Sequence, residues 1–157
     1  MAETSIEQRL LVLESIEAIR ELRCRYHELV NEDQGPRLHE LFAPDATIAY
    51  GGRPEVHGRV AIRDFFATFP VQHARQFVHN HVVHTDGRTG RGYSYLDGRP
   101  VKDGKSWYVV GRFDDEYVRL DGAWLFQRVV LTVHYMIEPG QGWDAHLPRQ
   151  VPAQGQR

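Results

Sequence analysis

Apolar residues recur every three or four positions between Ile6 and Leu29, the spacing of one face of an α-helix. Ser5 and Gln8 fit a capping box at the start of this segment, in which the hydroxyl and amide side chains each bind a free backbone N–H group. Turn-forming residues fill positions 31–35. The pattern therefore predicts one long amphipathic helix whose apolar stripe faces a single core.

Shorter elements follow this helix. Pro36 suits the first turn of a short second helix that runs to about Phe42, and Pro44 stops it. Residues 47–50 form a strand-like run that two glycines close. A third helix is predicted over residues 59–69, where aromatic and aliphatic residues again recur at helical spacing.

The rest of the chain changes to a period of two, which is typical of β-strands. Strands are predicted over residues 75–84, 89–96, 106–118 and 123–137, with a loop at 97–105. Asp-Gly pairs lie between these runs and favour hairpin turns, because both residue types tolerate positive φ. Helices first and strands last predict an α+β fold, in which helices cover one face of an antiparallel sheet.

The end of the chain differs in composition. Residues 139–157 are rich in Pro, Gly and Gln, which predicts an irregular tail. Trp143 is the exception, and we expect it to dock on its own subunit or on a neighbour. No repeat or linker divides the chain, so we expect one domain over residues 1–138 followed by this tail.

Composition excludes several classes of function. The chain of 157 residues has a formal net charge of −2, so it lacks the concentrated basic field that nucleic-acid binding uses. Its single cysteine, Cys24, excludes an intramolecular disulfide and is expected to be a buried or half-buried inert thiol. The sequence shows neither a signal-peptide pattern nor an apolar run of membrane-spanning length. We therefore expect a cytoplasmic protein with no nucleic-acid or membrane partner.

Candidate chemistry concentrates on the predicted strand 75–84, which carries three histidines, a Gln and an Asn. Strict alternation puts Gln76 and Asn80 on one face of this strand and His79 and His81 on the other. A pair of histidines two positions apart can bind a metal ion, but no Asp, Glu or Cys nearby completes a ligand set. We therefore expect no metal site here.

Short motifs along the chain, in order and spacing, resemble the SnoaL-like branch of the NTF2-like superfamily. They are Ile19-Arg-Glu-Leu22, Leu41-Phe-Ala-Pro-Asp-Ala46, Gly58-Arg-Val-Ala-Ile62, Asn80 before Asp86-Gly87, Gly111-Arg-Phe-Asp-Asp-Glu-Tyr117 and Asp121-Gly-Ala-Trp124. The resemblance covers roughly residues 15–138. It implies a cone-shaped α+β barrel, in which three N-terminal helices pack into a curved, mostly antiparallel sheet around an apolar cavity. It also implies a homodimer or homotrimer, with neither a metal nor an organic cofactor.

The layout is most similar to dehydratase and dehydrochlorinase members of this group, which implies a His/Asp dyad. In that mechanism an imidazole takes a proton, a carboxylate orients the imidazole, and a tyrosine polarises the substrate. The tyrosine position falls on Tyr26, but the Asp position falls on Asn31 and the His position on Gln76. Neutral amides donate and accept hydrogen bonds but are not useful bases. The family dyad is therefore disfavoured in this chain.

Three replacements for the missing dyad remain open. A β-bulge that shifts the register by one residue would aim His79 inward. His73, three positions before Gln76, would reach the rim by folding back. Glu32 or Asp33 would supply a carboxylate from just beyond the first helix.

These observations support two functions. The first is a cofactor-independent lyase, isomerase or cyclase that acts on a small hydrophobic polycyclic or aromatic substrate, with polar donors polarising a substrate oxygen. The second is a ligand-binding or oligomerisation module that kept the pocket and lost the dyad. The catalytic candidates are Tyr26, Asn31, Gln76 and His79, and the substrate-binding candidates are Tyr50, Phe66, Asn80, Tyr95, Trp107 and Tyr135.

Overall fold

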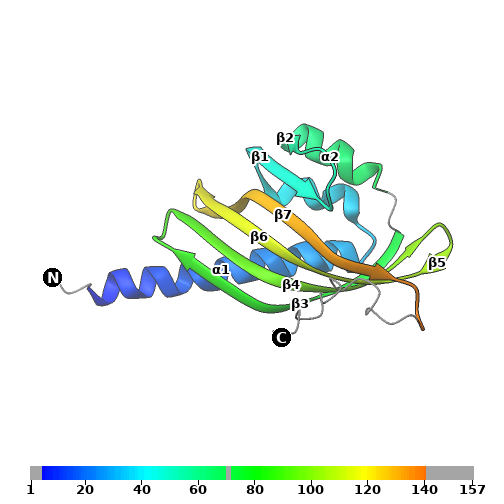
Figure 1. The fold of residues 1–157 in the computed structure, drawn as a ribbon. Helices are drawn as coiled ribbons and strands as arrows, with labels where there is room; N and C mark the ends of the chain where they lie inside the picture. The colour runs from blue at the N-terminus through cyan, green and yellow to red at the C-terminus, as the bar shows by residue number, and fades with distance from the viewer. Residues whose placement is uncertain (1–4, 70–71, 141–157) are drawn as a thin grey trace, which may run out of the picture.

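Helices come first along the chain and strands last, as the sequence predicts (Figure 1). The computed structural model describes residues 5–69 and 72–140, so the expected tail beyond Gly140, with Trp143, lies outside the described residues. The elements are α1 (Ile6–Asn31), the 3-10 helix η1 (Gly35–Leu41), β1 (Phe42–Tyr50), β2 (Val56–His57), α2 (Arg59–Ala67), β3 (Gln72–Thr85), β4 (Thr89–Lys102), β5 (Lys105–Ser106), β6 (Tyr108–Leu120) and β7 (Ala123–Ile137). Within the described ranges, no helix is long and apolar enough to cross a membrane.

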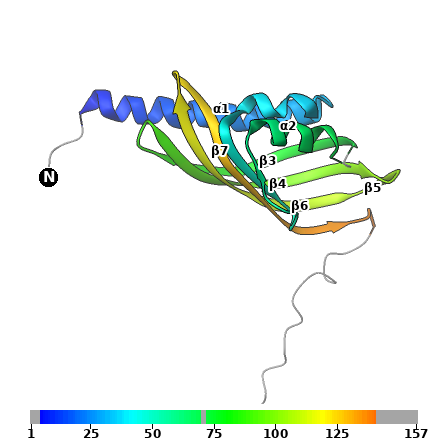
Figure 2. The ribbon, with the colours of Figure 1, turned by 90° about the horizontal axis from the view of Figure 1, so that it is seen from above.

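One sheet joins all the described strands. Their order is β2-β1-β7-β6-β4-β3, and β5 pairs with β4. The pair β1–β7 is parallel and the other pairs are antiparallel. The sheet curves strongly (Figures 1 and 2), but β2 and β3 lie at opposite ends of the strand order, so the described sheet is open. α1 packs mainly against β3, and α2 packs against η1 and β1.

Strands β4 and β1 extend well beyond their predicted bounds. β4 continues through Asp97 and Gly98, which pair with both β3 and β6 where a loop was expected. The turn falls instead at Asp103 and Gly104, whose φ angles are 53° and 72°. An Asp-Gly pair permits a turn without requiring one, and two neighbouring strands hold the first pair extended by ladder hydrogen bonds. β1 likewise begins at Phe42, where its parallel pairing with β7 starts.

The apolar stripe of α1 does not face the core along its whole length. Ile6, Leu10 and Leu13 are 81%, 53% and 64% exposed, whereas Ile19 is fully buried. Figure 2 shows the reason: the N-terminal part of α1 extends past the strands, so its first turns have no sheet to pack against. Cys24 is also exposed, contrary to the expected burial, because it lies between the buried positions rather than on their face.

A buried ion pair connects α1 to the sheet. Arg23 Nη2 lies 2.5 Å from Asp115 Oδ1 on β6, and neither side chain has any exposed surface. The guanidinium carbon lies 4.3 Å from the ring centroid of Phe113 and 4.4 Å from that of Phe126. The Tyr117 hydroxyl donates to Asp115 Oδ2 at 2.8 Å. Burial disfavours the Arg23 charge, but the carboxylate and the nearby tyrosines outweigh it, so the pKa of Arg23 is raised.

We expect Asp115→Asn to destabilise the protein by about 3–5 kcal/mol, because it leaves the Arg23 charge buried and uncompensated. Urea unfolding monitored by tryptophan fluorescence measures this change. Asp114→Asn is the matched control, because Asp114 is the neighbouring residue on β6 but is exposed and pairs with the surface residue Arg112. Equal urea midpoints for the two variants would contradict a structural role for the buried pair.

Candidate functional site

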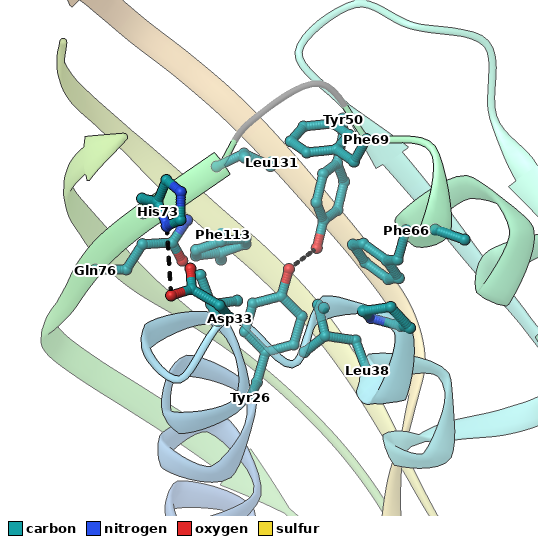
Figure 3. A pocket seen from close by; sticks show the side chains of 15 residues that line it. Tyr26, Asp33, Leu38, Tyr50, Phe66, Phe69, His73, Gln76, Phe113 and Leu131 are labelled. Atoms are coloured by element: carbon teal, nitrogen blue, oxygen red, sulfur yellow. Dashed lines mark hydrogen bonds and ion pairs between the residues drawn. The ribbon is translucent and has the colours of Figure 1, made fainter. Parts of the chain in front are cut away.

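A cavity of about 450 Å³ opens between the helices and the sheet (Figure 3). Most of its wall is apolar and comes from α1, η1, α2 and the strands that face them. These apolar residues include Val30, Leu38, Phe66, Phe69, Phe113 and Leu131. Phe66 and Tyr50, both predicted to face a ligand, are among the lining residues. A cavity of this size and lining suits a small ring compound.

Two phenols form the buried end of the cavity. The hydroxyl oxygens of Tyr26 and Tyr50 are 2.6 Å apart, and the two residues are only 3% and 5% exposed. Burial raises the pKa of Tyr26 to about 12 and raises the pKa of Tyr50 well above its ordinary value. Both phenols are therefore protonated at neutral pH. One O–H donates to its partner and the other is left to donate to a ligand.

A histidine and a carboxylate line the solvent-exposed part of the same cavity. His73 Nδ1 is 3.6 Å from Asp33 Oδ2, and both residues line the cavity (Figure 3). Their side chains are 70% and 43% exposed. The sequence left both residues open as replacements for the missing dyad, and the structure brings them together. Arg75 Nη2 also approaches Asp33 Oδ2, at 3.7 Å.

The end of α1 determines where Asp33 points. The backbone N–H of Asp33 donates to the carbonyl of Val30, and that of Gln34 donates to the carbonyl of Leu29. These two bonds form a Schellman motif, in which the residue just after the C-cap adopts the left-handed conformation. Asp33 is that residue, with a φ of 58°. Asp tolerates this conformation better than most residues do.

A β-bulge aims His73. The β3–β4 register shifts between Gln72 and Arg75, and His73 in this interval has a φ of 46°. A bulge inserts one residue into a strand and changes the direction of a side chain. His73 therefore turns toward α1 instead of following the alternation of β3. Backbone strain of this kind, roughly 1–3 kcal/mol, recurs at functional sites.

Asn31 and Gln76, the positions on which the expected dyad falls, are in direct contact. The Asn31 side chain donates from Nδ2 to the Gln76 carbonyl oxygen at 3.0 Å and accepts from the Gln76 backbone N–H at 2.6 Å. The amide thus binds the edge of β3 as a neighbouring strand would. Gln76 lines the cavity, whereas Asn31 is not among the lining residues.

His27 is the polar residue next to the cavity that the sequence analysis missed. Its Nδ1 lies 3.1 Å from Gln76 Oε1, and the residue is 4% exposed. Burial lowers the pKa of His27 to about 3, so the imidazole is neutral near pH 7. His27 lies four positions before Asn31, one helical turn away. That spacing places His27 and Asn31 on one helix face, so the sequence could have identified His27 as a neighbour of the candidate site.

His79 and Asn80 lie away from the cavity, contrary to their assignment. His79 is exposed and pairs with Tyr95 in the β3–β4 register, on the outer face of the sheet. A second bulge does occur, between His79 and Val82, with Asn80 exposed at a φ of 51°. It leaves His79 outside and turns His81 inward, where His81 Nε2 lies 3.1 Å from a buried tyrosine hydroxyl on β6.

Tyr95, Trp107 and Tyr135 are not cavity-lining residues either. Ser94 and Leu96, the neighbours of Tyr95 on β4, are buried, so alternation sends Tyr95 to the outer face. Trp107 donates its indole N–H to a backbone carbonyl at the β4–β5 turn. Within residues 5–69 and 72–140, no group of three or more His, Cys, Asp or Glu side chains is arranged to hold a metal ion.

We expect Asn31→Asp to destabilise the fold by about 1–3 kcal/mol, because a carboxylate cannot donate to the Gln76 carbonyl and repels it. Chemical denaturation measures this loss. Asn80→Asp is the control, since Asn80 is exposed and Asp tolerates its left-handed backbone. If Asn31→Asp were as stable as the unsubstituted protein, the two hydrogen bonds between Asn31 and the Gln76 backbone would not stabilise the fold.

Acid should weaken the fold through His27. Its pKa is about 3 when folded and 6.5 ordinarily, so the unfolded chain binds the proton more readily. The stability that depends on neutral His27 is present above pH 6.5 and is lost as pH falls toward 3. Between pH 8 and pH 5 we expect a loss of about 2 kcal/mol from this residue.

Urea midpoints across this pH range test the expectation. His27→Phe should flatten the dependence on pH, whereas the exposed His79→Gln should not. An identical pH slope for His27→Phe and the unsubstituted protein would contradict the assignment.

Comparison with known proteins places this architecture in a family. A family model described as a SnoaL-like domain matches residues 12–130. No curated protein sequence matches the chain. Among solved structures, LinA is similar with a TM-score of 0.78 and 20% identity over 86% of this chain and 96% of that chain.

Two further structures come from Novosphingobium. Hexachlorocyclohexane dehydrochlorinase LinA-type3 from Novosphingobium barchaimii LL02 has a TM-score of 0.74 and 19% identity, over 88% of this chain and 97% of that chain. A provisionally named scytalone dehydratase from Novosphingobium aromaticivorans DSM 12444 has a TM-score of 0.71 and 18% identity, over 83% and 91%. These likenesses show a shared fold. Because the family model spans most of the chain, the protein belongs to the SnoaL-like domain family.

Proposed function

We propose that this protein is a small-molecule lyase of the SnoaL-like group whose base is His73, oriented by Asp33. The observation that carries the proposal is their 3.6 Å contact at the exposed end of an apolar cavity with two phenols at its buried end. Similar structures named as a dehydrochlorinase and a dehydratase support the lyase class. Asp33 lies two positions after Asn31 in the chain, and His73 lies three positions before Gln76.

His73 has the properties of a usable base. With Nδ1 facing the Asp33 carboxylate, the favoured tautomer carries its proton on Nδ1 and leaves a lone pair on Nε2. His73 is exposed, so the imidazole exchanges its proton with solvent between turnovers. Solvent also weakens the electrostatic part of the pair, so we assign Asp33 the role of orienting the ring.

The tyrosine pair would bind the charge that develops on the substrate. An O–H group at the buried end of the cavity can donate to a substrate carbonyl oxygen, and this bond strengthens as the carbonyl becomes an enolate. The raised pKa of Tyr26, about 12, keeps it a donor rather than a phenolate. The apolar wall beside these groups suits the rest of the substrate ring, while the carbonyl oxygen would meet the phenols and the adjacent carbon would face His73.

A β-hydroxyketone illustrates the step. His73 Nε2 takes the proton from the carbon next to the carbonyl. The C–H electron pair forms a carbon–carbon double bond, and the carbonyl π pair moves onto the oxygen to give an enolate. The enolate then collapses to a carbon–carbon double bond, the C–O bond to the hydroxyl breaks, and the imidazolium returns its proton to the departing oxygen as water. A halide would leave without that proton. An isomerase or cyclase would use the same base and donors.

His73→Gln should lower kcat by about 10²–10⁴-fold, because glutamine cannot accept the proton. Asp33→Asn should lower it by roughly tenfold, since Asn keeps the left-handed backbone but no longer favours one imidazole tautomer. Two probe reactions measure this: dehydration of 3-hydroxy-1-tetralone to 1-naphthol, followed by fluorescence, and chloride release from hexachlorocyclohexane.

His79→Gln is the matched control, because His79 is an exposed histidine of the same strand on the outer face. Its activity should equal that of the unsubstituted protein. Full activity in His73→Gln would contradict the proposed base. Binding of both probes without turnover would favour the alternative, a ligand-binding module.

A further inference from the structure

We propose that Gln76 selects the ligand: held by His27 and Asn31, it presents only hydrogen-bond donors to the cavity. The ligand class this favours is a ring compound with an acceptor oxygen, such as a ketone, on the side that faces β3. A carbonyl oxygen has two lone pairs, so it can accept from Gln76 as well as from the tyrosine pair. The proposal rests on the cavity being the ligand site of the proposed function. It assigns a role to the one cavity-lining polar residue that the elimination step leaves unused.

The backbone of Gln76 is fixed first. Both of its backbone hydrogen-bonding groups bind the Asn31 side chain, at 3.0 Å and 2.6 Å. Asn31 is the last residue of α1, so these two hydrogen bonds join β3 to the end of that helix. The Cα of Gln76 therefore cannot shift along the cavity wall without breaking two hydrogen bonds.

The side chain is fixed by His27. Gln76 Oε1 faces His27 Nδ1 at 3.1 Å, and a carbonyl oxygen only accepts. The neutral imidazole must then carry its proton on Nδ1, which leaves a bare lone pair on Nε2. The reverse orientation of the amide would move that proton to Nε2, which is buried and has no hydrogen-bond partner among the described residues. An unpaired buried N–H group is disfavoured, so the observed orientation is the stable one.

The amide nitrogen consequently points away from His27 and offers N–H donors to the cavity. Figure 3 shows Gln76 on the cavity wall below His73 and beside Phe113. Gly98 pairs with Gln76 across β3 and β4 and has no side chain to bind the amide. A wall that donates and cannot accept favours a ligand oxygen and disfavours a ligand N–H group at the same place, which would stay unpaired.

Nitrogen NMR of the histidines tests the geometry without a ligand. We expect His27 to carry its proton on Nδ1 and not to titrate between pH 5 and pH 8. Gln76→Leu removes the acceptor and should abolish the preference for this tautomer. Gln76→Glu keeps an acceptor of the same shape and should retain it. Protonation at Nε2 in the unsubstituted protein would overturn the proposal.

Calorimetric binding of 1-tetralone and of tetralin at pH 8 tests the selectivity. The two compounds share a ring system and differ by the ketone oxygen. We expect the ketone to bind about five- to tenfold more tightly, the value of one neutral hydrogen bond. In Gln76→Glu the ratio should fall to about two or less, because the carboxylate offers no donor.

Three results would overturn the proposal. The first is that 1-tetralone binds no more tightly than tetralin, or does not bind. The second is an affinity ratio that stays unchanged in Gln76→Glu, and the third is a preference for the ketone that disappears only in Tyr26→Phe. The last result would assign the oxygen to the tyrosine pair alone and leave Gln76 without a role in selection. His73→Gln should keep both the His27 tautomer and the ketone preference. A failure of His73 as the base is thereby distinguished from a failure of Gln76 as the selector.

Discussion

The buried ion pair between Arg23 and Asp115 is the constraint on which the site depends. It fixes the position of α1 along the sheet and the rotation of the helix about its axis. Any other placement would leave a buried charge without its partner, which costs free energy. Tyr26 and His27 follow Arg23 within about one helical turn, so the same rotation aims them at the sheet. The end of α1 is then positioned for Asn31 to reach the edge of β3.

Two bulges in β3 determine which of its side chains face inward. A regular strand would keep all its odd-numbered residues on one face. The first bulge turns His73 toward α1, and the second turns His81 inward while His79 stays outside. The close approach that a bulge creates also explains Gly92, where a Cβ atom would lie 2.3 Å from the Val82 carbonyl oxygen.

Two amides stand where the family resemblance implies a His/Asp dyad. Asn31 and Gln76 still meet, as a dyad would, but they meet through a side-chain amide and a backbone peptide group. Such a contact holds two elements together and carries no proton. In the proposed mechanism the acid–base work moves to the exposed pair Asp33 and His73, whose positions depend on a helix end and a bulge. In that mechanism Asn31 and Gln76 hold the two elements together, and the nearby Asp33 and His73 carry out the proton transfer.

The sequence alone determined the helices, most strand positions, the Asp-Gly turns at 86–87 and 121–122 and the family, because these depend on periodicity and local backbone preference. It also identified Tyr26, Tyr50 and Phe66 as residues that face the cavity. Local patterns could not decide which residues of β3 point inward, since each bulge depends on the register with β4. Only the tertiary structure brought Asp33 within reach of His73, because that contact joins a helix end to a strand far along the chain.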